Sequence, residues 1–187
     1  EKIYWRYALK TENTFLQPFA DEERDYSEIE VLEVTLREVK QLNRLAEVIM
    51  RAIPYAMLIF FRHEERVQLW MGKLRHNMAD SSRMTLTVTE QTDWLTEDDG
   101  FWETLSLGAM PAANFCALYE AWFDAVSKSK LTNVGVAAES LSGDEARAIS
   151  ERLGDIEKEI GRLRSRMKRE SQFNRKLELN TRLQMLK

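Results

Sequence analysis

The chain has 187 residues, of which 44% are hydrophobic and 31% are charged, and its net charge is −4. This length is typical of one domain or of one domain with an appendage, and the composition excludes a disordered chain and a membrane protein. The longest apolar run, at 55–61, is far shorter than the roughly 20 residues that cross a bilayer.

Charge is distributed unevenly along the chain. Residues 162–187 hold nine lysines and arginines against two glutamates, a net charge of +7, which leaves −11 for residues 1–161. A basic tail on an acidic body predicts contact with an anionic surface, which could be nucleic acid, a partner protein or the body itself. A solvated helix face is the alternative interpretation.

The thiol content favours the cytoplasm. The one cysteine, Cys116, has no partner for an internal disulfide and lies among apolar neighbours. No basic-then-apolar leader precedes the first strand pattern, so we expect no secretory signal.

Apolar alternation predicts strands at 3–9 and 84–89, and apolar runs predict strands at 55–62 and 66–74. A further strand is expected at 29–36, where the apolar phase shifts between Val31 and Leu32, as a β-bulge or burial on both faces would require. The polar segment 11–27 predicts a loop, and 90–110 is expected to be irregular and anchored by aromatic residues.

Two helices are predicted to pack on this sheet. The first spans about 40–52 and stops where Pro54 removes a backbone donor. The second is expected to open at Pro111, and its apolar stripe consists of Phe115, Leu118, Tyr119, Trp122, Phe123 and Val126. The fold predicted for 1–128 is therefore α+β, with a mostly antiparallel five-stranded sheet and two packed helices.

A linker of small residues at 129–141 separates this domain from an amphipathic segment at 142–187. Ser142 and Glu145 match a capping box, after which apolar residues recur at heptad spacing. The predicted partner-binding stripe contains Ile149, Leu153, Ile156, Ile160, Leu163, Met167, Phe173, Leu177 and Leu183. Its register slips near Glu170, so the segment is expected to be one long coiled-coil-like helix or a helical hairpin that breaks near Ser171.

Basic residues crowd into four turns of the same segment. They are Arg162, Arg164, Arg166, Lys168, Arg169, Arg175 and Lys176. This cluster could grip the phosphates of DNA, or its side chains could flank the apolar stripe and pair with acids on a partner protein. We favour the partner interpretation.

The sequence predicts no catalytic residue, metal site or cofactor. One cysteine and two separated histidines, His63 and His76, do not supply a zinc site, and nothing assigns a base to Cys116. Glu38, Val39 and Lys40 match the acid-x-lysine motif of many metal-dependent nucleases, in which two carboxylates hold Mg²⁺. The second carboxylate would come from Asp25 or Glu33, upstream in the chain. A solvated ion pair at a strand end is the alternative interpretation.

Three stretches carry a resemblance to a known family. They are KIYWRYALK at the start, RLAEVIMRAIPYAMLIFFRHEERVQLWMGKLR in the middle and KRESQFNRKLELNTRLQMLK at the end. Together they resemble the prokaryotic family called domain of unknown function 4391, including its Ile53–Pro54 junction and the step from Glu170 to Gln172. The resemblance implies a genomic setting beside DNA methyltransferases and helicase-nucleases in restriction-like or phage-defence operons. It implies no activity.

The leading hypothesis is a non-enzymatic adaptor subunit of a DNA restriction-modification or phage-defence system, which associates through the C-terminal segment. Its expected partner is a second copy, a DNA methyltransferase or a helicase subunit. No contact with a membrane is expected. A direct DNA-binding protein and a metal-dependent nuclease are the alternatives.

Overall fold

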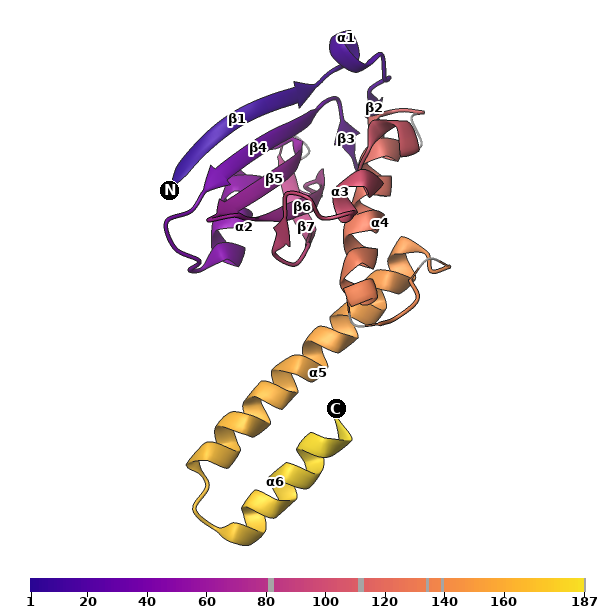
Figure 1. Cartoon of the computed structure of the whole chain (residues 1–187). Coiled ribbons are helices and arrows are strands. Elements are labelled where there is room, and N and C mark those ends of the chain that lie inside the picture. Colours follow the sequence, from indigo (N-terminus) through magenta and orange to yellow (C-terminus); the bar gives the residue numbers. More distant parts are fainter. Residues whose placement is uncertain (81–82, 111–112, 134, 139, 187) are drawn as a thin grey trace.

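The computed structural model describes residues 1–80, 83–110, 113–133, 135–138 and 140–186, and it shows a body of sheet and helices from which two further helices project (Figure 1). The strands are β1 (Lys2–Leu9), β2 (Phe19–Ala20), β3 (Asp25–Tyr26), β4 (Ile29–Thr35), β5 (Ala56–His63), β6 (Arg66–His76), β7 (Met84–Gln91) and β8 (Leu95–Thr96). The helices are α1 (Thr11–Thr14), α2 (Leu42–Ala52), α3 (Phe101–Thr104), α4 (Phe115–Asn133), α5 (Gly143–Arg169) and α6 (Phe173–Met185), with a 3-10 turn at Leu107–Ala109.

The main sheet is mostly antiparallel, as predicted, but it has six strands and not five. Its order is β1-β4-β5-β6-β7, and β8 pairs with the first residues of β6. Only β4 and β5 run parallel among the paired strands of this described sheet, because α2 connects them as a crossover. The strand β8 has two residues, which is too short to produce an alternating pattern in the sequence.

Both faces of the central strands are buried. Ile29 of β4 and Leu58 of β5 pack into the cluster that contains α4, whereas Leu32 and Ile59 pack into the cluster that contains α2. Successive side chains of a strand point to opposite faces, so α4 and α2 cover opposite faces of the sheet. Burial on both faces explains the apolar phase of β4. The pairing of β1 with β4 also shifts register at the predicted step, because Leu32 pairs with Trp5 and Val31 pairs with Tyr7, which leaves the extra residue on β1.

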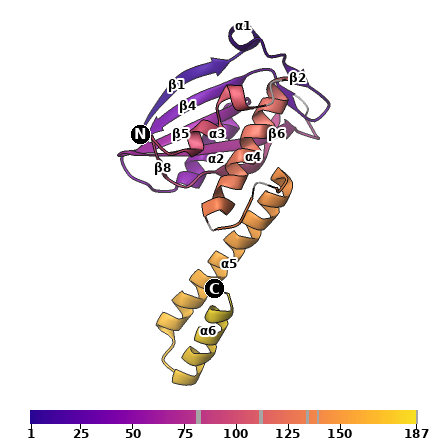
Figure 2. The same cartoon turned by 45° about the vertical axis from the view of Figure 1, so that its right-hand side comes forward.

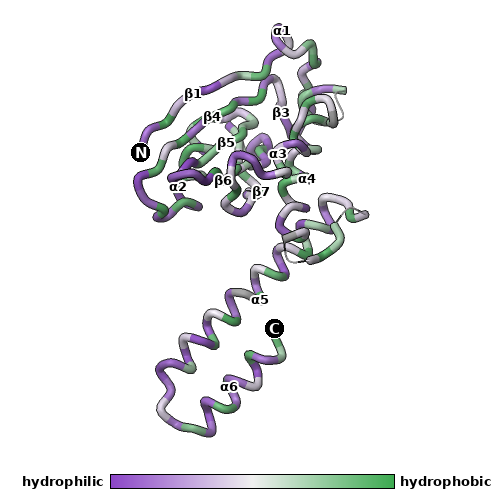
Figure 3. The backbone as a smooth tube through the Cα atoms, viewed as in Figure 1, coloured by the Kyte–Doolittle hydropathy of each residue, from purple (hydrophilic) through white to green (hydrophobic). Residues whose placement is uncertain are grey.

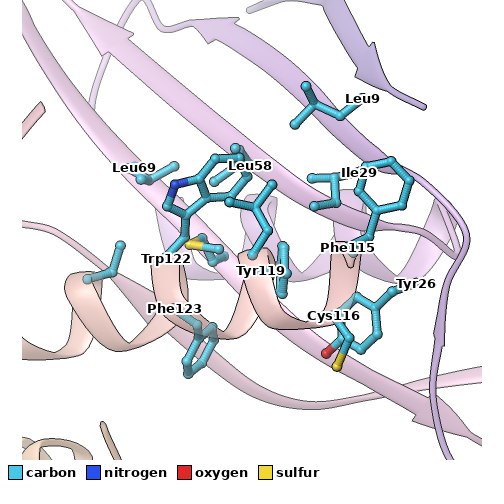
Figure 4. Packing of buried hydrophobic residues seen from close by; sticks show 14 residues of the cluster. Leu9, Tyr26, Ile29, Leu58, Leu69, Phe115, Cys116, Tyr119, Trp122 and Phe123 are labelled. Atoms are coloured by element: carbon cyan, nitrogen blue, oxygen red, sulfur yellow. The ribbon is translucent and has the colours of Figure 1, made fainter. Parts of the chain in front are cut away.

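The core on the α4 face is built from the aromatic stripe predicted for that helix (Figure 4). Figure 2 shows α4 lying across the sheet. Tyr119 is fully buried there, and its hydroxyl accepts a hydrogen bond from the Gly72 N–H at 3.1 Å. The same hydroxyl lies 2.9 Å from the Gly72 carbonyl oxygen and 3.0 Å from that of Met57. Tyr119 therefore ties α4 to two neighbouring strands.

The segments predicted to be irregular contain short elements. The stretch 11–27 includes α1 and the β2–β3 pair, and 90–110 includes β8 and α3. Such elements are too short for a periodic signal. Pro111, predicted to open the second helix, lies outside the described residues. The division at 1–128, 129–141 and 142–187 stays a prediction, and α4 continues as a helix through the first part of that linker.

The C-terminal segment does not form one long helix. It breaks after Arg169, and α6 returns beside the second half of α5 (Figures 1 and 2). We call α5, the turn at 170–172 and α6 the C-terminal hairpin. The break coincides with the slip in the heptad register near Glu170, where polar residues replace the expected seam positions.

Candidate protein-interaction surface

The start of α5 is fixed to α4. Ser142 Oγ accepts a hydrogen bond from the Glu145 N–H at 3.3 Å, and Glu145 Oε2 accepts one from the Ser142 N–H at 2.8 Å, which forms the predicted capping box. Leu131, Ala138 and Ala146 are buried together beside this cap. The cap and the small apolar cluster fix where the hairpin leaves the body.

A glycine allows α4 and α5 to approach closely. A Cβ atom at Gly143 would lie 1.7 Å from Oδ1 of Asp124, so a larger residue requires the carboxylate to move. Burial at this contact raises the pKa of the Asp124 carboxyl above its usual value.

The turn of the hairpin is organised by Glu170. Its Oε1 atom accepts hydrogen bonds from the backbone N–H groups of Ser171 at 2.9 Å and Gln172 at 3.0 Å. These bonds, chiefly that from Gln172, lower the pKa of the Glu170 carboxyl. Glu170 and Gln172 both have extended backbone conformations, so the helical hydrogen-bond pattern stops between them.

Two leucines close the seam between the helices of the hairpin. Leu163 of α5 is 2% exposed and Leu183 of α6 is 4% exposed. Nearby, Arg182 of α6 forms an ion pair with Glu159 of α5 at 2.8 Å. Because the chain reverses direction at 170–172 and α6 returns beside α5, the two helices are antiparallel (Figure 1). The hairpin thus covers part of its own apolar stripe.

The nine residues predicted to bind a partner have four different environments. Ile149 and Leu153 pack against the small cluster beside α4, while Ile156, Ile160 and Met167 along α5 are half-buried. Leu163 and Leu183 are buried within the seam. Phe173 and Leu177 remain 76% and 56% exposed. The sequence did not single out Met185, which is 81% exposed on the same helix.

One face of α6 is exposed and carries no charge. Its residues are Phe173, Asn174, Leu177, Asn180, Thr181, Gln184 and Met185, and all of them are exposed. The charged residues of α6 occupy the rest of the helix surface, as helical spacing requires. Figure 3 shows the mixture of apolar and polar residues along the hairpin. A charge-free face with three exposed apolar side chains has the composition of an interface core, which is depleted of charge.

The predicted basic cluster is divided between two flanks of the hairpin. Arg166, Arg169 and Arg175 line a cavity of about 530 Å³, together with Arg182, Leu179, Glu170 and Glu178. Lys168 and Lys176 border a separate groove of about 370 Å³, whose other lining residues are Met167, Phe173, Leu177 and Asn180. Arg162 lines a third depression with Arg166, and Arg164 is exposed. Basic residues that are adjacent in the sequence, such as Lys168 and Arg169, thus line different depressions of the hairpin.

The residues considered for chemistry lie apart. Glu38 pairs with Lys40 at 2.7 Å in an exposed turn, and Glu33 is bound by Arg6 on the sheet. Cys116 is buried, and burial raises the pKa of its thiol. Among the described residues, no group of three or more His, Cys, Asp or Glu side chains is placed to hold a metal ion.

The whole chain, residues 1–187, matches the family described as "Domain of unknown function (DUF4391)". The chain belongs to this family. No match was found among curated proteins or among solved structures. In the part of this family member that the structure describes, no helix is both long and apolar enough to span a membrane.

Proposed function

We propose that this DUF4391 protein is a non-enzymatic adaptor subunit of a DNA restriction-modification or phage-defence system, and that it binds its partner through the C-terminal hairpin. The observation that carries the proposal is the exposed, charge-free face of α6 with Phe173, Leu177 and Met185. Exposed apolar side chains that gather on one face mark interaction surfaces. The genomic setting is supported by the family resemblance.

The hairpin is suited to an adaptor because its own contacts leave this face free. α6 buries Leu183 at the seam, whereas Phe173, Leu177 and Met185 stay mostly exposed. The buried cluster of Leu131, Ala138 and Ala146 attaches the start of α5 to α4. A projecting helix pair can then reach a partner without rearrangement of the body.

The test is co-purification of the chain with the DNA methyltransferase or helicase subunit encoded beside its gene. The double substitution Phe173→Ser and Leu177→Ser is expected to lower the amount of captured partner at least about tenfold. Burial of one such side chain contributes about 1.5–3 kcal/mol, and each 1.4 kcal/mol corresponds to about a factor of ten.

Substitution of two exposed apolar residues of the body supplies the matched control. Phe15→Ser and Met78→Ser remove similar side chains away from the hairpin, and the double variant should capture the partner like the unmodified chain. Equal capture by the hairpin variant and the control would contradict the proposal.

Direct DNA binding is a second candidate function, and the arginine-lined cavity favours it. Among the described residues, Arg166 and Arg169 form no ion pair or side-chain hydrogen bond, so both guanidinium groups are free to bind phosphate oxygens. Arg175 lies 4.0 Å from Glu170, and Arg182 pairs with Glu159, which leaves these two arginines less available.

Arg166→Gln with Arg169→Gln is expected to weaken retention of duplex DNA and to reduce the slope of log K against log salt by about two, one for each lost phosphate contact. Arg152→Gln, on an exposed part of α5 away from the cavity, is the control and should change neither quantity. Absence of measurable retention by the unmodified chain at low salt excludes this function.

A further inference from the structure

The groove between the second half of α5 and α6 combines an apolar floor with cationic borders. Met167, Phe173 and Leu177 provide its apolar surface, and Lys168 and Lys176 stand at its sides. The described residues that line it include no aspartate or glutamate, whereas the arginine-lined cavity on the other flank contains Glu170 and Glu178. The two flanks therefore have different chemistry.

The lysines of the groove form no direct ion pair among the described residues, and Lys176 interacts with the carboxylate of Glu170 only at longer range. In the part of the chain that the structure describes, neither Lys168 nor Lys176 forms an ion pair or a side-chain hydrogen bond. Arg164 is also exposed and lies one helical turn before Lys168, so it extends the cationic border along the same face of α5. Both borders are thus available to acidic groups from outside.

We propose that this groove binds an amphipathic helix of the partner, whose apolar stripe contacts Phe173 and Leu177 and whose edges carry aspartate or glutamate. The inference rests on the proposed function and specifies the chemistry of the partner. At a rise of about 1.5 Å per residue, the part of α6 that lines the groove, from Phe173 to Asn180, spans about 10 Å, which suits contact with about two turns of a partner helix. Recognition of this kind places an apolar helix face in a groove and fixes its register through charges at the edges.

Charge complementarity favours this occupant over a second copy of the hairpin. Residues 162–187 carry a net charge of +7, so two hairpins pressed together at this groove would bring like charges close to each other. A polyanion such as DNA would satisfy the lysines but would leave Phe173 and Leu177 facing phosphate groups. An acidic amphipathic helix satisfies both the cations and the apolar floor.

The test uses two synthetic, fluorescently labelled helical peptides of about 16 residues with the same leucine stripe. One peptide carries glutamate at its edges and the other carries lysine. The unmodified chain is expected to bind the glutamate peptide at least about tenfold more tightly than the lysine peptide. Lys168→Glu with Lys176→Glu should reverse this order, and Arg152→Glu, away from the groove, should preserve it.

Several results would overturn the inference. These are equal affinity for the two peptides, no binding of the glutamate peptide at millimolar concentration, or an order of affinities unchanged by Lys168→Glu with Lys176→Glu. A dimeric molecular mass in solution that becomes monomeric in the Phe173→Ser and Leu177→Ser variant would also overturn it. Circular dichroism of each variant, matched to the unmodified chain, establishes that the hairpin is folded. Capture of the partner that depends on Phe173 and Leu177 but not on Lys168 and Lys176 would leave the adaptor function standing while the acidic-helix inference fails.

Discussion

Phe123→Ala is expected to lower the free energy of unfolding of the body by about 3–5 kcal/mol, because the substitution leaves a cavity in a closely packed core. The Phe123 side chain is fully buried in the core on the α4 face. Its ring also lies beneath two cations, with Lys73 Nζ at 4.6 Å and the Arg147 guanidinium carbon at 5.4 Å from the ring centroid. Urea denaturation followed by circular dichroism measures the change.

The matched control is Phe173→Ala in the hairpin. Phe173 is mostly exposed, so its truncation should change the free energy of unfolding by less than about 0.5 kcal/mol. Because Arg147 belongs to α5, the Phe123 variant should also loosen the attachment of the hairpin, which the control should not do. Similar losses of stability in the two variants would contradict the assignment of core and surface.

Leu163→Asp is expected to open the C-terminal hairpin while the body stays folded. The substitution places a carboxylate at the buried position 163 on α5, and an unpaired buried charge is costly. A helix of 13 residues is marginal in water without packing, so α6 should lose its helical structure once the seam is broken. Hydrogen exchange of the amides at 173–185 should become rapid.

Met185→Asp provides the comparison for the seam variant. Met185 is on α6 but is exposed, so the same charge at this position should leave the exchange of the α6 amides nearly unchanged. The denaturation midpoint of the body should be the same in both variants. Slow exchange of α6 in the Leu163→Asp variant would show that the seam does not hold the hairpin together.

The sequence predicted the body better than the C-terminal segment. Long strands such as β5 and β6 were predicted because their apolar residues persist over many positions, while the two-residue strand β8 offered no such pattern. The turn at Glu170 was indicated by the loss of heptad register. Whether the segment would continue or fold back depended on the burial of Leu163 and Leu183 between the two helices, which no local pattern encodes.

The candidate surface was predicted in its residue types but not in its arrangement. Helical periodicity groups Leu163, Phe173 and Leu183 into one apolar stripe, yet it does not say which of them face the other helix of a hairpin. The structure buries the two leucines and leaves Phe173 exposed. The basic cluster shows the same limit, since Arg169 and Lys168 are adjacent in the sequence but line different flanks.

The adaptor function depends on contact between the exposed, charge-free face of α6 and the partner. Site-specific photo-cross-linking tests that contact most directly. A photoreactive residue at position 177 or 185 should cross-link to the captured partner, whereas the same residue at the exposed position 78 of the body should not. A partner that is captured in full but cross-links to neither position on α6 would contradict the account.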